Sequence, residues 1–380
     1  MQIYSTGWDE RIPIIKLNLN VKIGALAILA LFIFGKTSFA VTALDPTSAD
    51  DFFALNNLGY AGVPIVGYDD KSGWLYGGAG FVYSDEEPGV NAGLFAVSNF
   101  NDFYSTTLNF EQRMNAWLFA FHGLAERSFD NYYGEGDLTS TNNSFFIAMV
   151  HFEAKPSLMY RFLRHFRAGI YDDYRSRTEE GTVRSGAAEP GDPKRLFPDE
   201  NTNALGFHME WDTRDKIINT RKGDFFQFNI TDAPAGWTSW PGSNGFVQAQ
   251  VDLRRFRTIF RHVTLGSRFM AALTEGMPTY LFNYRLGGLD ALRGYEDNRF
   301  RGKDFSVIQE EIRWYLIKWL SVNVSTDLGD IGDGSFHQAK ITEQAGIRVG
   351  LPPDWVQKMR IDLGYGFDQN TFQIQFGEIF

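Results

Sequence analysis

Apolar and polar residues alternate one by one along many stretches of this chain. The chain ends in FQIQFGEIF, where Phe372, Ile374 and Phe376 are separated by Gln373 and Gln375. The same alternation runs through residues 225–231, 247–254, 321–327 and 359–366. A period of two residues places apolar side chains on one face of a β-strand and polar side chains on the other. The pattern therefore predicts a protein built from two-faced strands.

Two architectures use such strands. A soluble sandwich buries the apolar faces, whereas a membrane barrel turns them to lipid and keeps the polar faces in a wet lumen. Here the polar faces carry Arg, Asp, Glu and Gln, and many strands have the length of about ten residues that a tilted membrane strand needs. We predict an all-β transmembrane antiparallel β-barrel of about 16 strands. The expected strands are 61–69, 73–84, 89–100, 103–112, 115–124, 143–154, 158–174, 203–213, 223–233, 244–257, 261–274, 304–317, 318–328, 341–350, 356–366 and 371–380.

The connections between these strands alternate in length. Bacterial barrels have short periplasmic turns and longer outer loops. If the N-terminus lies in the periplasm, the short connections of this chain fall on the periplasmic side and the long ones on the outer side. The connection 214–222 is the exception, a longer turn on the periplasmic side. The short set is 154–157, 257–260, 317–318 and 351–355, and the long set is 125–142, 175–202, 275–303 and 329–340.

The C-terminal strand is expected to close the barrel. A barrel has no free edge only if its first and last strands pair, so we expect a seam between 61–69 and 371–380. Phe372 and Phe376 lie on one face of the last strand, and a terminal aromatic residue such as Phe380 is typical of barrels inserted by dedicated machinery. Gly377 is expected to weaken this seam.

The N-terminal residues resemble a secretory signal. Residues 23–34 form a short apolar run that follows Lys16 and Lys22 and precedes small residues at Ser38 and Ala40. This arrangement predicts a cleaved signal peptide over residues 1–40, and an uncleaved anchor helix is the alternative. Residues 41–60 would then be a short lead segment before a barrel over residues 61–380, too short to be a domain.

Composition removes several classes of function. The net charge of −10 argues against a nucleic-acid partner, and the absence of Cys removes thiol and disulfide chemistry. His208, Glu210 and Asp212 share one face of a strand, but lumenal polar residues are expected there and no tetrahedral set supports a metal. No nucleophile motif or phosphate-binding Gly loop is present. We expect no enzyme activity, no catalytic residues, no cofactor and no metal.

The stretch 284–303, YRLGGLDALRGYEDNRFRGK, resembles the signature loop of the bacterial surface-antigen superfamily, which contains the outer-membrane barrel-assembly factors. The resemblance rests on Arg293-Gly294-Tyr295 and on the paired Gly287 and Gly288. Further matches are Asp327-Leu328-Gly329, the turn DTRD (212–215) with TRKG (220–223), YGEG (133–136) and Gly346-Ile347-Arg348. Together they cover roughly residues 60–380, nearly the whole chain after the signal.

The resemblance implies that the loop folds back into the lumen of a sixteen-stranded barrel. By alternation, Asp327, Gln309, Glu311 and Arg313 already point into that lumen. We therefore expect Arg293 to pair with Asp327, with Glu311 as a second candidate, because charge-assisted Arg–carboxylate bonds are strong and directional. The other expected loop-anchoring positions are Gly329 and Arg313.

The resemblance also implies a function in assembling or translocating proteins, or lipids, at the bacterial outer membrane. The seam would open and template or release a client, with outer-membrane lipid and a client protein as partners. Family members usually carry periplasmic polypeptide-transport-associated domains, and this chain looks like a barrel-only member. A homo-oligomer or a separate periplasmic partner chain is possible. The alternative function is a closed structural barrel or passive pore.

Overall fold

A computed structural model describes most of the chain after residue 58. The described residues are 59–69, 72–83, 89–136, 139, 144–184, 197–216, 219–288, 290–332, 339–350, 358–367 and 369–376. The expected signal peptide and nearly all of the expected lead segment lie outside them. Among the described residues, none belongs to a helix with the length and apolar character required to cross a membrane.

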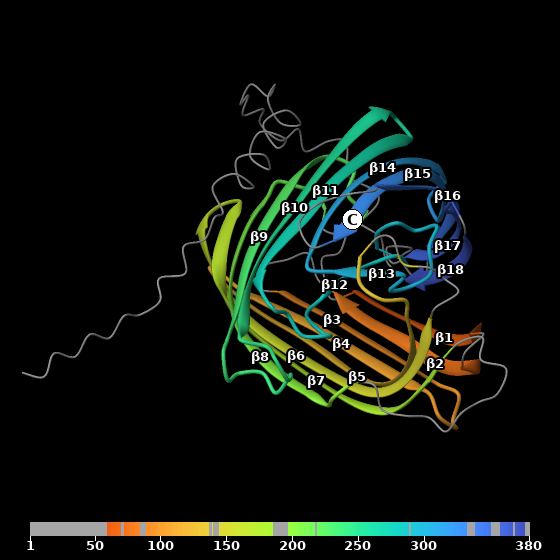
Figure 1. Ribbon diagram of the computed structural model, residues 1–380. Coiled ribbons are helices and arrows are strands. Elements are labelled where there is room, and N and C mark those ends of the chain that lie inside the picture. The colour runs from red at the N-terminus through yellow and green to blue at the C-terminus, as the bar shows by residue number, and fades with distance from the viewer. Residues whose placement is uncertain are drawn as a thin grey trace, which may run out of the picture. The chain divides into compact units, whose positions relative to one another are not determined.

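Sixteen antiparallel strands form one sheet in which neighbours in sequence are neighbours in space (Figure 1). The predicted all-β barrel of about 16 strands is confirmed. The strands of this sheet are β1 (Gly59–Asp69), β2 (Gly73–Tyr83), β3 (Gly89–Ser98), β4 (Tyr104–Met114), β5 (Trp117–Tyr132), β6 (Phe145–Leu163), β7 (Phe166–Arg184), β8 (Glu200–Asp212), β9 (Gly223–Pro234), β10 (Gly245–Phe260), β11 (Val263–Gly276), β14 (Asp304–Ile317), β15 (Leu320–Gly332), β16 (Lys340–Gly350), β17 (Lys358–Tyr365) and β18 (Asn370–Phe376).

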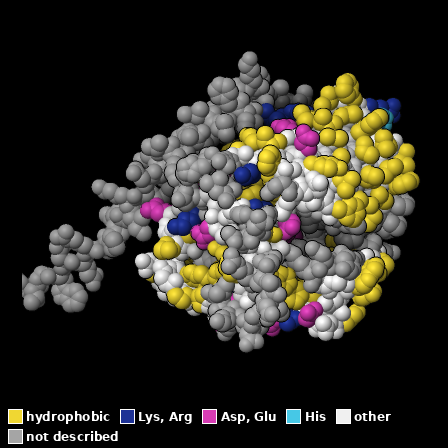
Figure 2. Space-filling view, turned by 45° about the vertical axis from the view of Figure 1, so that its right-hand side comes forward, with side chains coloured by type: hydrophobic (Ala, Val, Ile, Leu, Met, Phe, Trp, Pro, Cys, Tyr) yellow, Lys and Arg dark blue, Asp and Glu magenta, His cyan; other side chains and the backbone are white. Residues whose placement is uncertain are grey.

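The two faces of the sheet differ as the alternation predicts. On β14, Ile312 and Trp314 are about half exposed on the outer face, whereas Glu311 and Arg313 are at most 2% exposed on the inner face. In Figure 2, hydrophobic side chains gather in a broad patch on the face in view. A barrel buries polar side chains in its lumen and presents apolar side chains to lipid, so this inversion of the soluble pattern follows from the fold.

The predicted turn at 154–157 is wrong. Those residues lie inside β6, which continues to Leu163, and the turn to β7 is formed by Arg164 and His165. Pro156 pairs with Phe121 of β5, but the described pairing with β7 gives neither Lys155 nor Pro156 a partner. A proline lacks the N–H that a central strand position would use, so the ladder tolerates Pro156 by an interruption on one side.

The connection between β11 and β14 folds inward, which confirms the predicted lumenal loop. Within it, the short strands β12 (Tyr284–Leu286) and β13 (Phe300–Gly302) pair with each other and lie on the inner side of the sheet (Figure 1). In the described residues, β1 pairs with β2 and β18 pairs with β17, and no pairing joins β1 to β18. The edge strands of the sheet are therefore the two that the sequence assigns to the seam.

Candidate functional site

The inserted loop is a ribbon with a glycine-dependent bend. Tyr284 of β12 faces Gly302 of β13 at the base of the ribbon. Gly287 and Gly288 adopt φ angles of 104° and 93°, which side chains rarely tolerate. The Gly288 N–H donates to the carbonyl of Tyr295 at 2.9 Å, so the bend brings the start of the loop back onto its tip. The paired glycines therefore shape the loop.

Arg293 occupies the tip of this loop and is completely buried. Its Nε donates to Oδ2 of Asp327 at 2.8 Å, its Nη2 contacts the other oxygen of that carboxylate, and its Nη1 lies 3.2 Å from Glu311. Burial alone lowers the pKa of the Arg293 guanidinium, but the hydrogen bonds and charges of the two carboxylates outweigh it and raise this pKa above its ordinary value. The structure thus brings Arg293 to both expected carboxylates.

Glu311 extends this contact into a wider ion-pair network on the lumenal wall. The Nε of Arg313 contacts one oxygen of Glu311, and Nη2 of Arg348 lies 3.5 Å from the other. The sequence did not single out Asp362, which joins Arg348 at 2.6 Å and Arg360 at 3.0 Å. Alternation places Arg360 and Asp362 on the polar face of the expected strand 356–366, but it cannot say which polar residues meet.

The backbone of the tip fits a gap that only glycine leaves open. A Cβ on Gly294 would collide with the backbone of Tyr365 and Gly366 at the end of β17. The carbonyl of Arg293 accepts a hydrogen bond from the Thr371 hydroxyl at 2.7 Å. The loop tip is therefore attached to β17 and β18 as well as to β14 and β15.

An apolar cluster packs the loop against the wall. The Leu292 side chain packs close to Gly329, and a Cβ at position 329 would lie only 3.0 Å from it. The absence of a side chain on Gly329 therefore makes room for Leu292. The Tyr295 ring packs edge-on to the Phe300 ring, with the two ring centroids 5.0 Å apart. The buried cluster comprises Met270, Ala272, Leu286, Ala291, Leu292, Tyr295, Phe300, Phe305, Val307 and Ile331. The loop thus covers apolar residues that point into the lumen.

A second anchor holds the loop from the opposite side. The Tyr133 hydroxyl donates to Glu296 at 2.6 Å, and the Gly136 N–H donates to the carbonyl of Arg301 at 2.6 Å. The guanidinium of Arg301 forms a buried ion pair with Asp130 of β5. The sequence singled out the YGEG stretch at 133–136 by resemblance alone, and the structure shows that this stretch contacts the inserted loop.

The remaining sites named from sequence are distributed as follows. Phe372 is exposed, and Phe376 pairs through its backbone with Met359, whereas Gly377 and Phe380 lie outside the described residues. Nδ1 of His208 lies 2.5 Å from Oδ1 of Asn229, and Nε2 of His208 lies 3.5 Å from Oε2 of Glu210. No group of three potential metal ligands occurs in the part of the chain that the structure describes.

Comparison with known proteins places this fold. No curated protein sequence matches the chain. The crystal structure of BamA from Haemophilus ducreyi lacking POTRA domains 1–3 is similar, with a TM-score of 0.54 and 11% identity over 84% of this chain and 69% of that one. CdiB from Escherichia coli has a TM-score of 0.57 at 11% identity, over 84% of this chain and 61% of that one. CdiB from Acinetobacter baumannii has a TM-score of 0.52 at 11% identity, over 83% of this chain and 59% of that one.

These structures share the fold of this chain, and the chain spans less than two thirds of the length of either CdiB. The sequence itself supplies stronger evidence, because the model of the Omp85 superfamily domain matches residues 167–380, more than half of the chain. The matched region contains the inserted loop and every strand that its tip touches. The chain therefore belongs to the Omp85 superfamily.

Proposed function

We propose that this protein assists the insertion or transport of proteins, or of lipids, at the bacterial outer membrane through a lateral seam. Membership of the Omp85 superfamily supports an outer-membrane assembly or translocation factor. The similarity in fold to BamA and to CdiB points the same way. Residues 1–40 would act as a removable export signal, with 41–60 as a lead segment.

The observation that carries this proposal is the position of the buried Arg293 contact relative to the sheet edges. The loop tip joins β14, β15 and the β17–β18 end of the sheet, so these strands are held in one register. In the described residues, β1 and β18 each have one neighbour. A strand edge presents unpaired N–H and C=O groups to which a client strand can add. The proposed cycle opens this edge while the loop preserves the remaining wall.

The proposed mechanism involves only non-covalent steps. Opening the seam exposes backbone groups, pairing with a client strand satisfies them, and release restores the seam. No cofactor, metal or catalytic residue is required in this scheme. A client protein and outer-membrane lipid are the proposed partners, and a separate periplasmic chain or a second copy would act beside them.

The alternative is a closed structural barrel or passive pore. One observation favours it: a lumenal cavity of about 480 Å³ lies beside the N-terminal strands, lined by residues such as Asn109, His122, Ser157 and Asn229. Its lining also contains apolar residues such as Phe81, Phe110 and Met159, and open space of this kind inside the lumen is what the passage of small solutes would require. Stable ion conductance without any effect on a client would favour this function over the proposed one.

A client-folding assay separates the two functions. The full chain is reconstituted in vesicles, and the folding of an unfolded barrel client is followed by protease protection beside Arg293→Ala. We expect the native chain to accelerate client folding and Arg293→Ala to lose most of this acceleration. A folded native chain without acceleration would reject the proposal.

A second variant tests the seam itself and does not depend on the stability of the loop. The chain has no Cys, so paired cysteines introduced into β1 and β18 would be the only thiols. Oxidation should lock the seam and stop client folding, and reduction should restore it. Pairs introduced into β9 and β10, which are already adjacent, serve as the control. Equal activity with locked and unlocked seams would exclude a lateral route.

A further inference from the structure

Four consecutive turns at one end of the sheet carry exposed cations. They connect β6 to β7, β8 to β9, β10 to β11 and β14 to β15, and belong to the short-turn end of the barrel. We call the exposed cations in these turns and in the adjoining strand ends the basic rim, which consists of Arg164, Lys222, Arg257, Arg261 and Lys318. This concentration of positive charge contrasts with the net charge of −10 for the whole chain.

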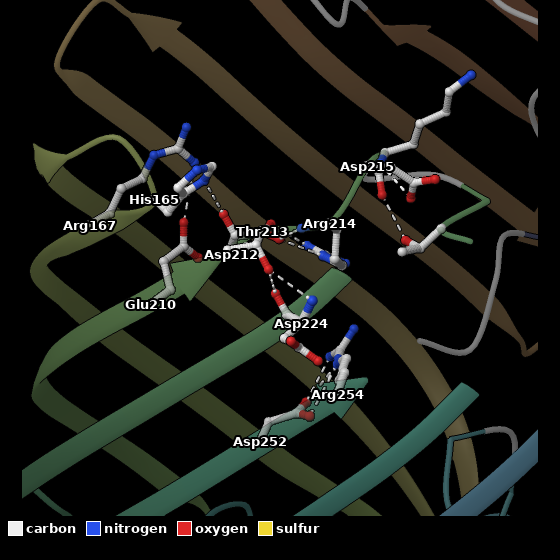
Figure 3. Close-up of polar contacts among 12 residues, drawn as sticks. His165, Arg167, Glu210, Asp212, Thr213, Arg214, Asp215, Asp224, Asp252 and Arg254 are labelled. Carbon is white, nitrogen blue, oxygen red and sulfur yellow. Dashed lines mark hydrogen bonds and ion pairs between the residues drawn. The ribbon is translucent and has the colours of Figure 1, made fainter. Parts of the chain in front are cut away.

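The carboxylates near the basic rim are already engaged (Figure 3). Asp212 forms an ion pair with Arg214 at 2.7 Å, and Asp224 forms one with Arg255 at 2.8 Å. Asp215 instead accepts the backbone N–H groups of Lys216, Arg221 and Lys222 at 3.0–3.2 Å, which fixes the shape of the β8–β9 turn.

Three cations of the rim have no acidic partner among the residues that the structure describes. Within the described part of the chain, no carboxylate lies within ion-pair distance of the side chains of Arg164, Lys222 or Arg261. Of the other two cations, Arg257 lies 3.3 Å from Asp224. Because the nearby acids are used elsewhere, the rim presents a positive surface to its surroundings.

The basic rim directly borders the lipid-facing surface. Phe162 and Leu163 precede Arg164, and Ile259 and Phe260 precede Arg261; all four apolar side chains are exposed, Leu163 and Phe260 to 70%. Trp319, also exposed, follows Lys318. Aromatic residues mark the membrane interface in barrels of this type, so these cations lie at the level of the lipid headgroups.

We propose that the basic rim binds anionic phospholipid headgroups of the phosphatidylglycerol class, in the membrane leaflet at the short-turn end. A lipid leaflet fits this surface better than an acidic protein does, because the cations directly adjoin apolar side chains of the lipid-facing surface. Each Lys or Arg near an anionic surface strengthens binding by about fivefold, so several together create a preference over zwitterionic lipid. The proposal goes beyond the client-handling function and holds equally for a passive pore.

Lipid selectivity at the protein surface tests the proposal. The full chain is reconstituted in phosphatidylcholine vesicles with trace spin-labelled phosphatidylglycerol or spin-labelled phosphatidylcholine, and the motionally restricted fraction of each label is measured. We expect phosphatidylglycerol to be preferred by about fivefold or more at low salt, because several cations contribute. The preference should fall toward unity in about 1 M salt, where the Debye length shrinks to about 3 Å.

Matched variants assign the effect to the rim. Arg164→Gln with Arg261→Gln should reduce the preference to about twofold or less, whereas Arg164→Lys with Arg261→Lys should retain it. Lys303→Gln with Lys340→Gln removes the same charge from the long-loop end and should leave the preference unchanged. Equal binding of the two lipids, or an equal loss in the Lys303 and Lys340 control, would overturn the proposal.

Discussion

The Arg293 guanidinium and the Asp327 carboxylate form a two-point contact inside the barrel, with Nε at 2.8 Å from Oδ2 and Nη2 against Oδ1. The backbone N–H of Arg293 also reaches Oδ2, at 3.2 Å. Both side chains are at most 1% exposed. The contact therefore couples the tip of a loop to the middle of a strand without competition from solvent.

Removing either partner of this contact should be costly and the two losses should not add. Arg293→Ala or Asp327→Ala leaves a buried charge without its partner, for which we expect a loss of about 3–5 kcal/mol in the free energy of unfolding. The double variant should lose less than the sum of the two. Urea unfolding of the reconstituted barrel measures all three values.

The control for this cycle combines Arg293→Ala with Asp252→Ala, because Asp252 contacts Arg254 and Arg268 instead. That combination should be additive within about 0.5 kcal/mol. If the Arg293 and Asp327 variants proved equally additive, the contact would not be energetically coupled.

The Gly294 position should reject even a methyl group. Gly294→Ala places a Cβ into the backbone of Tyr365 and Gly366, and overpacking of this kind costs about 1–3 kcal/mol. Gly80→Ala is the matched control, because a Cβ there meets no atom within 4 Å. The two free energies of unfolding are compared directly. An equal effect of both substitutions would mean that the tip relaxes away from β17.

The hydrogen bond between Tyr133 and Glu296 should hold the opposite side of the loop. Tyr133→Phe keeps the ring beneath Arg299, whose guanidinium lies 4.6 Å from it, and removes only the hydroxyl. A hydrogen bond to a charged group contributes about 1.5–3 kcal/mol, which is the expected loss. Tyr174→Phe, which removes an exposed bond to Asn201, should cost less. Increased protease cleavage within residues 284–303 should accompany the loss at Tyr133 and not at Tyr174.

Alkaline pH should weaken the same anchor. Burial, and then the hydrogen bond and charge of Glu296, raise the pKa of the Tyr133 hydroxyl above its ordinary value. The folded state therefore retains a proton that the unfolded state releases above about pH 10, and stability falls as pH rises through that range. The native chain should lose more stability than Tyr133→Phe between pH 9 and pH 11. A constant difference between them over this range would contradict the assignment.

The arrangement of the strands could be predicted because alternation is a local property. Each strand of a barrel needs one apolar and one polar face, so Glu311, Arg313 and Asp327 could be placed in the lumen from their spacing alone. The turn between β6 and β7 does not follow from this reasoning, because proline is typical of turns whereas Pro156 lies inside β6. Strand boundaries depend on partners across the ladder, which a single stretch of sequence does not contain.

The sequence by itself determined the two-faced strands, their number and, with the family resemblance, the loop that enters the lumen. Only the tertiary structure decided which charges meet there, because Arg293, Glu311, Arg348 and Asp362 come from a loop and three different strands. It also explained Phe305, Val307 and Ile331, apolar residues on the lumenal face that the inserted loop covers. Alternation specifies the face of a strand, whereas contacts within the lumen depend on how distant segments are packed together.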